Sequence, residues 1–440
     1  MNSTLLICVM FFGMILLLLT GRQIFIVIGA VGTILALFLW GKGAYFIPFS
    51  KGTTFLDFYS LLAIPPFIFM GLMLSRSGVA ERIFYAAYVW VGRLPGGLGI
   101  VSILLSAVIA AMSGTNIAAT VSAGTISLPA MLKRNYNKRF SVGLCLAGGA
   151  LGFLIPPSVV FIFYGVIAKV SIAFLWLAGI GPGILLVVLY IIYIYFLCKK
   201  HPEIAPPIPI EEFQKITFKD RMAALGAAIP PIFLIVTVLS FLFLGVTTLV
   251  ESSAIGALGA IICAAINKRL SWNVIKKTME DGLQTTTMVM WIISAAFLFS
   301  AVFDGLGAID GVEKMLNMFG GGKWTILIMM QISFLFLGMI LDDTAMLIIV
   351  APLYIPLVAK LGFDLRWFGV LYVLNCQMAF ITPPFGYNLF IMKGIAPEGI
   401  TTEDIYRSVL PFVVIQIIAL GLVMLFPQIA MFLPNLKYGG

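Results

Sequence analysis

Long apolar runs separated by short polar segments make up most of this 440-residue chain. Most runs are long enough for a helix that crosses a bilayer, which needs about 20 apolar residues. The alternating short strands of a membrane barrel are not seen. The pattern therefore predicts an all-α polytopic membrane protein. The runs lie at residues 4–20, 24–40, 61–74, 97–132, 141–168, 172–198, 223–244, 246–266, 288–303, 324–359, 367–396 and 408–433.

Two of these runs, 97–132 and 324–359, are interrupted in the middle by small polar residues. The interruptions begin at Ser113 and at Asp342. Each arm then has about 16 residues, which is about 24 Å of helix, whereas the hydrocarbon core of a bilayer is about 30 Å thick. We therefore predict two re-entrant helical hairpins.

Each hairpin is followed by an apolar run that contains two adjacent prolines, Pro156-Pro157 and Pro383-Pro384, 227 residues apart. Proline removes a backbone donor and disfavours helix at the preceding residue, so both segments should be unwound in the membrane. Unwound backbone is tolerated there when it lines a polar cavity, and its carbonyl oxygens are good ligands for sodium. The alternative is a plain kink, with the nearby Ser, Asn and Asp residues acting as helix caps.

The two copies also match upstream of the prolines without a gap, Ala118 with Ala345 and Phe153 with Phe380. The loop that closes the first hairpin, 133–139, carries four basic residues and no acid, which is typical of a cytoplasmic loop. Counting helices from there puts the second hairpin and the amino terminus on the outer face of the membrane. We therefore predict an inverted repeat with its axis in the membrane plane, and the pairing of both motifs in both halves favours a transport site.

Composition supports this interpretation, with 61% apolar residues, 10% charged residues and a net charge of +9. The excess of Lys and Arg matches the cytoplasmic bias of membrane proteins and needs no nucleic-acid partner. The five cysteines form no close-spaced pair, and the only histidine, His201, lies in a polar linker, so neither a metal framework nor a disulfide framework is expected. No catalytic arrangement is recognised, and an enzyme is not expected. The first run has no basic residue before it, which favours a retained helix over a signal peptide.

Polar side chains at the hairpin tips face the two breaks in this scheme. The helix amino ends at Asn116 and Thr344 would offer N–H groups to an anion. Adjacent carboxylates at Asp342 and Asp343 repel an anion unless a cation lies between them, which favours a coupling cation near the second tip, with a helix cap at Asp343 as the alternative. The run 288–303 adds hydroxyls that either line a pathway or bond between helices. The candidate substrate-lining residues are Asn116, Ser294, Ser300 and Asn388.

Several stretches resemble the large membrane subunit of TRAP transporters, the DctM-like family, over nearly the whole chain. They are Leu62-Ala63-Ile64-Pro65, Ser113-Gly114-Thr115-Asn116, the stretch 152–158, the stretch 177–183 and the stretch 381–386. The resemblance implies sodium-driven import of a small organic acid in a bacterial inner membrane. It also implies a small four-helix membrane subunit and a periplasmic substrate-binding protein as partners, and an elevator-type transport domain within a scaffold.

By the same resemblance, the tips and breaks form two sodium sites, with sodium as the coupling ion and no other cofactor. The first would comprise Ser113, Gly114, Thr115, Asn116, Pro156, Pro157 and Ser158. The second would comprise Asp342, Asp343, Thr344, Thr382, Pro383 and Pro384. Asp343 stands where the family often has proline, and residues 47–60 fit the family poorly, so substrate-selective contacts there stay unassigned.

The expected organisation has scaffold helices at 1–96 and a first transport half at 97–168. A scaffold helix at 169–198 and a cytoplasmic linker at 199–222 follow. The second repeat has scaffold helices at 223–287, a lining helix with the second transport half at 288–396, and a C-terminal helix at 397–440. A stand-alone sodium and carboxylate symporter, and a channel or structural membrane subunit, remain as alternative functions.

Overall fold

The computed structural model of the chain describes residues 3–18, 20–41, 43–207, 216–306 and 322–439. Within these ranges the regular structure is entirely helical, and eight helices are long and apolar enough to cross a membrane. The prediction of an all-α polytopic membrane protein is confirmed.

The first half contains the first predicted hairpin and the first predicted broken helix. Its helices are α1 (Ser3–Leu18), α2 (Ile24–Leu39), α3 (Phe46–Gly52), α4 (Ile64–Arg76), α5 (Val79–Val91), α6 (Gly97–Ser113), α7 (Asn116–Ser122), α8 (Leu128–Leu132), α9 (Lys138–Ala150), α10 (Val159–Ala168) and α11 (Ile172–Lys200). Hairpin 1 is therefore α6 with α7 and α8, and the first broken helix is α9 with α10. A π-helical turn at Ala123–Ser127 separates α7 from α8.

The second half repeats the order of a hairpin followed by a broken helix. Its helices are α13 (Phe218–Leu244), α14 (Leu249–Ile266), α15 (Trp272–Gly305), α17 (Lys323–Ile340), α18 (Asp343–Lys360), α19 (Leu365–Ala379), α20 (Tyr387–Ile395), α21 (Thr402–Ser408), α22 (Leu410–Leu425) and α23 (Gln428–Tyr438). Hairpin 2 is α17 with α18, and the second broken helix is α19 with α20.

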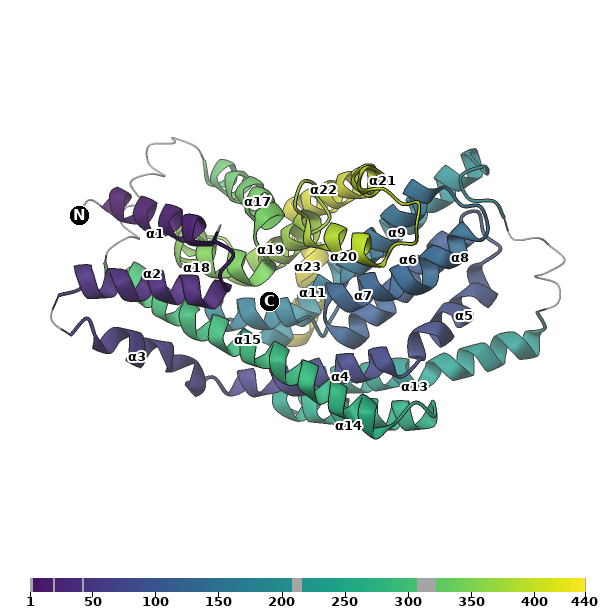
Figure 1. Cartoon of the computed structure of the whole chain (residues 1–440), viewed down its shortest axis with the longest axis horizontal. Helices are drawn as coiled ribbons and strands as arrows, with labels where there is room; N and C mark the ends of the chain where they lie inside the picture. The colour runs from purple at the N-terminus through teal and green to yellow at the C-terminus, as the bar shows by residue number, and fades with distance from the viewer. Residues whose placement is uncertain (1–2, 19, 42, 208–215, 307–321, 440) are drawn as a thin grey trace.

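The long helix α15 organises one side of the molecule. It packs along α2 and α4, while α14 packs on α4 and α13 packs on α5 (Figure 1). Close approach depends on small residues: a methyl group on Gly32 of α2 would lie 3.2 Å from Leu298 Cγ of α15. At the far end of α4, Arg76 Nη1 donates to Thr278 Oγ1 at 3.0 Å and the same guanidinium pairs with Asp281.

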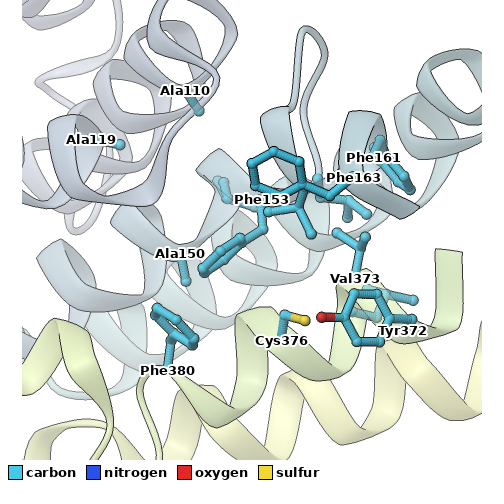
Figure 2. Packing of buried hydrophobic residues seen from close by; sticks show 14 of the residues in the cluster. Ala110, Ala119, Ala150, Phe153, Phe161, Phe163, Tyr372, Val373, Cys376 and Phe380 are labelled. Carbon is cyan, nitrogen blue, oxygen red and sulfur yellow. The ribbon is translucent and has the colours of Figure 1, made fainter. Parts of the chain in front are cut away.

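The hairpins and broken helices form the other side, where their breaks meet in one apolar core. Phe153 and Phe380, the equivalent residues of the two repeats, contact edge to face with ring centroids 4.7 Å apart and planes at 79°. Figure 2 shows these rings facing one another, with Ala150 beside them. The contact brings the two proline-containing segments to the centre of the fold, as expected of paired repeats.

The division into scaffold and transport segments stays a prediction, and two of its segments can be compared with the observed helices. The boundary between 287 and 288 falls inside α15, because the polar residues before it continue the same helix. The helix predicted as scaffold at 169–198 is α11, which packs mainly on α6, α10, α19, α22 and α23. Its Trp176 is fully buried against α4 and the first break.

Candidate functional site

The tip of hairpin 1 is a tight turn between two helices. Gly114 has a φ of +64°, in the left-handed region that glycine adopts without steric cost. Ser113 Oγ donates to the Ile109 carbonyl at 2.9 Å, and Thr115 N donates back to Ser113 Oγ at 3.3 Å. The hydroxyl therefore holds the tip together, and Asn116 starts the second arm.

The first broken helix is unwound between Ala150 and Val159, apart from one 3-10 turn, as the proline pair predicts. The two prolines are joined by a cis peptide bond, as is the second pair, Pro383-Pro384. Ser158 Oγ donates to the Phe153 carbonyl at 2.5 Å, and Trp176 Nε1 donates to the Ser158 carbonyl at 3.0 Å. The unwound backbone is thus anchored by side chains on both sides of the break.

Hairpin 1 and the first break touch backbone to backbone. A methyl group on Gly114 would overlap the Pro157 carbonyl oxygen, and one on Gly152 would overlap the Thr115 carbonyl. Val159 N also donates to the Gly114 carbonyl at 3.3 Å. The structure therefore brings the first predicted set together, and it gathers neutral carbonyl and hydroxyl oxygens, the donor type that suits a hard monovalent cation.

Hairpin 2 has a different tip. Asp342 is the N-cap of α18, and its Oδ1 accepts a hydrogen bond from Ala345 N at 2.6 Å. The Asp343 carbonyl accepts a hydrogen bond from the Tyr372 hydroxyl of α19. Helix α17 runs beside α19 as far as the break, where a methyl on Gly338 would lie 2.6 Å from Ala379 Cβ. The helix cap predicted at Asp343 is therefore supplied by Asp342, and Asp343 is the first residue of α18.

The second predicted set is joined less directly than the first. Thr382 Oγ1 donates to the Met378 carbonyl at 2.7 Å, and Tyr406 donates to the Pro384 carbonyl at 2.8 Å. Among the described residues, no hydrogen bond links Asp342, Asp343 or Thr344 to these break residues. The tip of hairpin 2 and the second break are held near one another because α17 packs against α19.

A buried pair of amides links the two repeats. Asn116 Nδ2, at the start of α7, donates to Asn388 Oδ1 of α20 at 2.7 Å. Both side chains are buried, and Asn388 Nδ2 has no hydrogen-bond partner. A buried donor without a partner is costly and needs an explanation, and a ligand oxygen would supply one.

The two serines of α15 have different surroundings. Ser294 Oγ donates to the Gly52 carbonyl at 2.6 Å, which is the interhelical bond left open as an alternative. Ser300 lines a cavity of about 810 Å³ that is bounded by α2, α3, α10, α15 and α18. Of the two, Ser300 is the one that faces this cavity.

These features agree with the comparison with known proteins. Residues 11–429 match the model of a protein family described as "Tripartite ATP-independent periplasmic transporter, DctM component". The chain belongs to this DctM family. It is a multi-pass membrane transporter subunit, as the sequence motifs predict.

Named relatives of this DctM-family chain are permeases and not enzymes. The C4-dicarboxylate TRAP transporter large permease protein DctM of Pseudomonas aeruginosa is 29% identical over 380 residues, 86% of this chain and 87% of that protein. The isethionate TRAP transporter permease protein DctMQ of Oleidesulfovibrio alaskensis is 31% identical over 86% of this chain and 59% of its own length. The crystal structure of the YdaH transporter of Alcanivorax borkumensis superposes with a TM-score of 0.65 at 14% identity, covering 98% of this chain and all of that one, which shows a shared fold.

Three residues that support the candidate site of this DctM-family chain were not identified from the sequence. Trp176 and Tyr372 each donate one hydrogen bond to a backbone carbonyl of the site, and Gly71 of α4 lets the tip of hairpin 1 approach, since a methyl there would lie 2.7 Å from Ser113 Cα. A polar aromatic residue inside an apolar run is a usable signal, because a buried Trp or Tyr needs a partner for its donor. Nothing in the sequence distinguishes Gly71 from the other helical glycines.

We expect Asn116→Ala and Asn388→Ala each to lower the thermal unfolding midpoint of the purified chain, because each leaves a buried amide unpartnered at a cost of about 1–3 kcal/mol. The double variant should lose less than the sum of the two, since it removes both members of the pair. Thermal unfolding of all four proteins in detergent measures this coupling. Strictly additive losses would show that the two amides do not interact.

Proposed function

We propose that this protein is the large permease subunit of a TRAP transporter that imports a small organic acid, carboxylate or sulfonate, coupled to sodium. The observation that carries the proposal is the direct backbone contact between hairpin 1 and the first break at Gly114, Gly152 and Pro157. This arrangement gathers carbonyl oxygens at a junction inside an apolar protein, where a sodium ion would add to the hydrogen bonds that the Gly114 and Thr115 carbonyls already accept.

In this proposal the first set, with Thr115 and Pro157 at its centre, holds one sodium ion through neutral oxygens. The second set adds the carboxylates of Asp342 and Asp343, whose charge a cation would offset. The bound sodium ion offsets the negative charge of the substrate anion when the anion enters the site. Helix amino ends at Asn116 and Asp343, together with the unpartnered amide of Asn388, supply donors for the head group of the acid.

We further propose an elevator mechanism and two partners in a bacterial inner membrane. A small four-helix membrane subunit would cover part of the lipid-facing surface, and a periplasmic binding protein would deliver the acid. The relative named DctMQ supports the first partner through the two components in its name. The basic loop at Lys133 to Arg139 favours an orientation with the amino terminus in the periplasm.

Uptake by proteoliposomes tests the coupling. With this chain, its small partner subunit and the cognate binding protein loaded with radiolabelled acid, an inward sodium gradient should raise the initial uptake rate by at least about tenfold over a potassium gradient. Uptake that is indifferent to sodium contradicts the proposed coupling. Equal uptake of free acid without the binding protein would instead indicate a stand-alone symporter.

A further inference from the structure

A large cavity lies between the helices α2, α3 and α15 on one side and α10 and α18 on the other. Its volume is about 810 Å³, and its walls are mostly apolar, with Phe58, Phe297 and Ile348 among them. The chain reaches it from four separate segments, so no single stretch of sequence reveals it. The amide pair of Asn116 and Asn388 is not part of its lining.

Three charged side chains line this cavity, and two of them are cations. Lys51 comes from α3, Lys169 follows the last residue of α10, and Asp304 lies near the end of α15. Within the described part of the chain, neither lysine has a carboxylate at ion-pair distance. The cavity therefore carries one net positive charge.

Apolar walls raise the effect of this charge. A concave surface with low-dielectric walls focuses the field of the groups that line it and concentrates ions of the opposite sign. The hydroxyls of Thr54 and Ser300 lie in the same lining and can donate or accept hydrogen bonds. Cations, hydroxyls and one carboxylate together form a polar surface suited to a hydroxylated anion.

We propose that this cavity is an anion subsite for an organic acid that carries one anionic head group and hydroxyl groups. The head group lies between Lys51 and Lys169, and the Asp304 carboxylate accepts a hydrogen bond from a substrate hydroxyl. A second carboxylate on the ligand would face Asp304, and the like charges would repel one another. The substrate class therefore excludes dicarboxylates, an inference that rests on the proposed transport of organic acids.

Charge-selective labelling of one engineered cysteine tests the electrostatic part. Ser300→Cys places a thiol on the cavity wall. Cys145, Cys198, Cys263 and Cys376 are buried, and labelling of the parent chain measures the background from all five native cysteines, Cys8 included. The anionic reagent methanethiosulfonate ethylsulfonate should react faster than its trimethylammonium counterpart, relative to their rates with a free thiol. Adding Lys51→Ala or Lys169→Ala should lower this ratio about fivefold, whereas adding Asp304→Asn should raise it.

Lys393→Ala is the matched control, because this lysine lies on α20 outside the cavity lining and should leave the ratio unchanged. A ratio that does not respond to Lys51, Lys169 or Asp304 overturns the assignment. Labelling needs neither a sodium gradient nor the binding protein, so its failure is distinguishable from failure of the proposed coupled uptake.

Ligand protection tests the substrate class in the same Ser300→Cys chain. Gluconate, a hydroxylated monoanion, should slow labelling of Cys at position 300 by the anionic reagent at least about threefold at millimolar concentration, and succinate should not. Asp304→Asn should make succinate protective, because it removes the repelling carboxylate. Stronger protection by succinate than by gluconate in the unsubstituted cavity, or no protection by either acid, overturns the proposal.

Discussion

Alanine at Gly114 or at Gly152 is expected to reduce sodium-dependent uptake by more than about tenfold. Each added methyl group would overlap backbone atoms of the opposing segment, the Pro157 carbonyl in one case and the Thr115 carbonyl in the other. Backbone atoms cannot rotate away as a flexible side chain can, so the tip of hairpin 1 must move away from the break. Overpacking of this kind costs about 1–3 kcal/mol.

The two substitutions differ in backbone strain, and the thermal unfolding midpoint reports this difference. Gly114 has a left-handed backbone, so alanine there adds conformational strain of about 1–2 kcal/mol. Gly152 adds the steric overlap alone. Both variants should lower the thermal unfolding midpoint, and Gly114→Ala should lower it more.

Gly421→Ala is the matched control, because this glycine lies on α22 with nothing within 4 Å of the added methyl. It should leave uptake and the unfolding midpoint unchanged. Uptake by proteoliposomes and unfolding in detergent are measured on the same preparations. Normal uptake by Gly114→Ala and Gly152→Ala would show that close contact between tip and break is not needed for transport.

The hairpins and breaks could be predicted because their signals are local. Polar residues in the middle of an apolar run, such as Ser113 and Asp342, leave two arms that are each too short for a full crossing. The pairs Pro156-Pro157 and Pro383-Pro384 each interrupt a helix, whereas Pro230-Pro231 lies within α13 without breaking it, so it is the repetition after each hairpin that carries the signal. The polar interruption and the following proline pair both occur twice, and this repetition indicates the paired repeats without any knowledge of how the helices pack.

Contacts between distant segments could not be predicted in the same way. The bond of Asn116 to Asn388 joins residues 272 positions apart, and the cavity around Lys51 and Lys169 joins four segments. The apolar run 288–303 also covers only the second half of α15, which begins at Trp272. The polar first half of this helix makes contacts with other segments, such as the hydrogen bond of Arg76 to Thr278. Periodicity reports which face of a helix is buried, and it does not report which partner covers that face.

The repeats are also chemically unequal, which symmetry alone does not predict. Asn116 in the first tip corresponds to Asp343 in the second, and Gly152 corresponds to Ala379. The glycine lets the first tip approach the break directly, whereas Ala379 contacts Gly338 of α17. The second tip therefore combines a looser backbone contact with two carboxylates, and charge is the property that distinguishes it.

Asp342→Asn is expected to lower the apparent sodium affinity of uptake by at least about tenfold while leaving the thermal unfolding midpoint unchanged. Asparagine caps a helix about as well as aspartate, so it can keep the bond from Ala345 N, but it removes the negative charge. Asp342→Ala removes both, and it should add a loss of about 1 kcal/mol from the lost cap.

The comparison of these two variants separates the two roles of Asp342, because only the charge is relevant to a cation and only the bond is relevant to the helix. Initial uptake rates measured across a range of external sodium concentrations give the apparent affinity, and unfolding in detergent without sodium gives the stability. If Asp342→Asn transports with unchanged sodium dependence while Asp342→Ala fails, the carboxylate is a helix cap and the second cation site must be sought elsewhere. If both lose sodium affinity equally and only the alanine variant loses stability, the charge of Asp342 acts on the coupling ion.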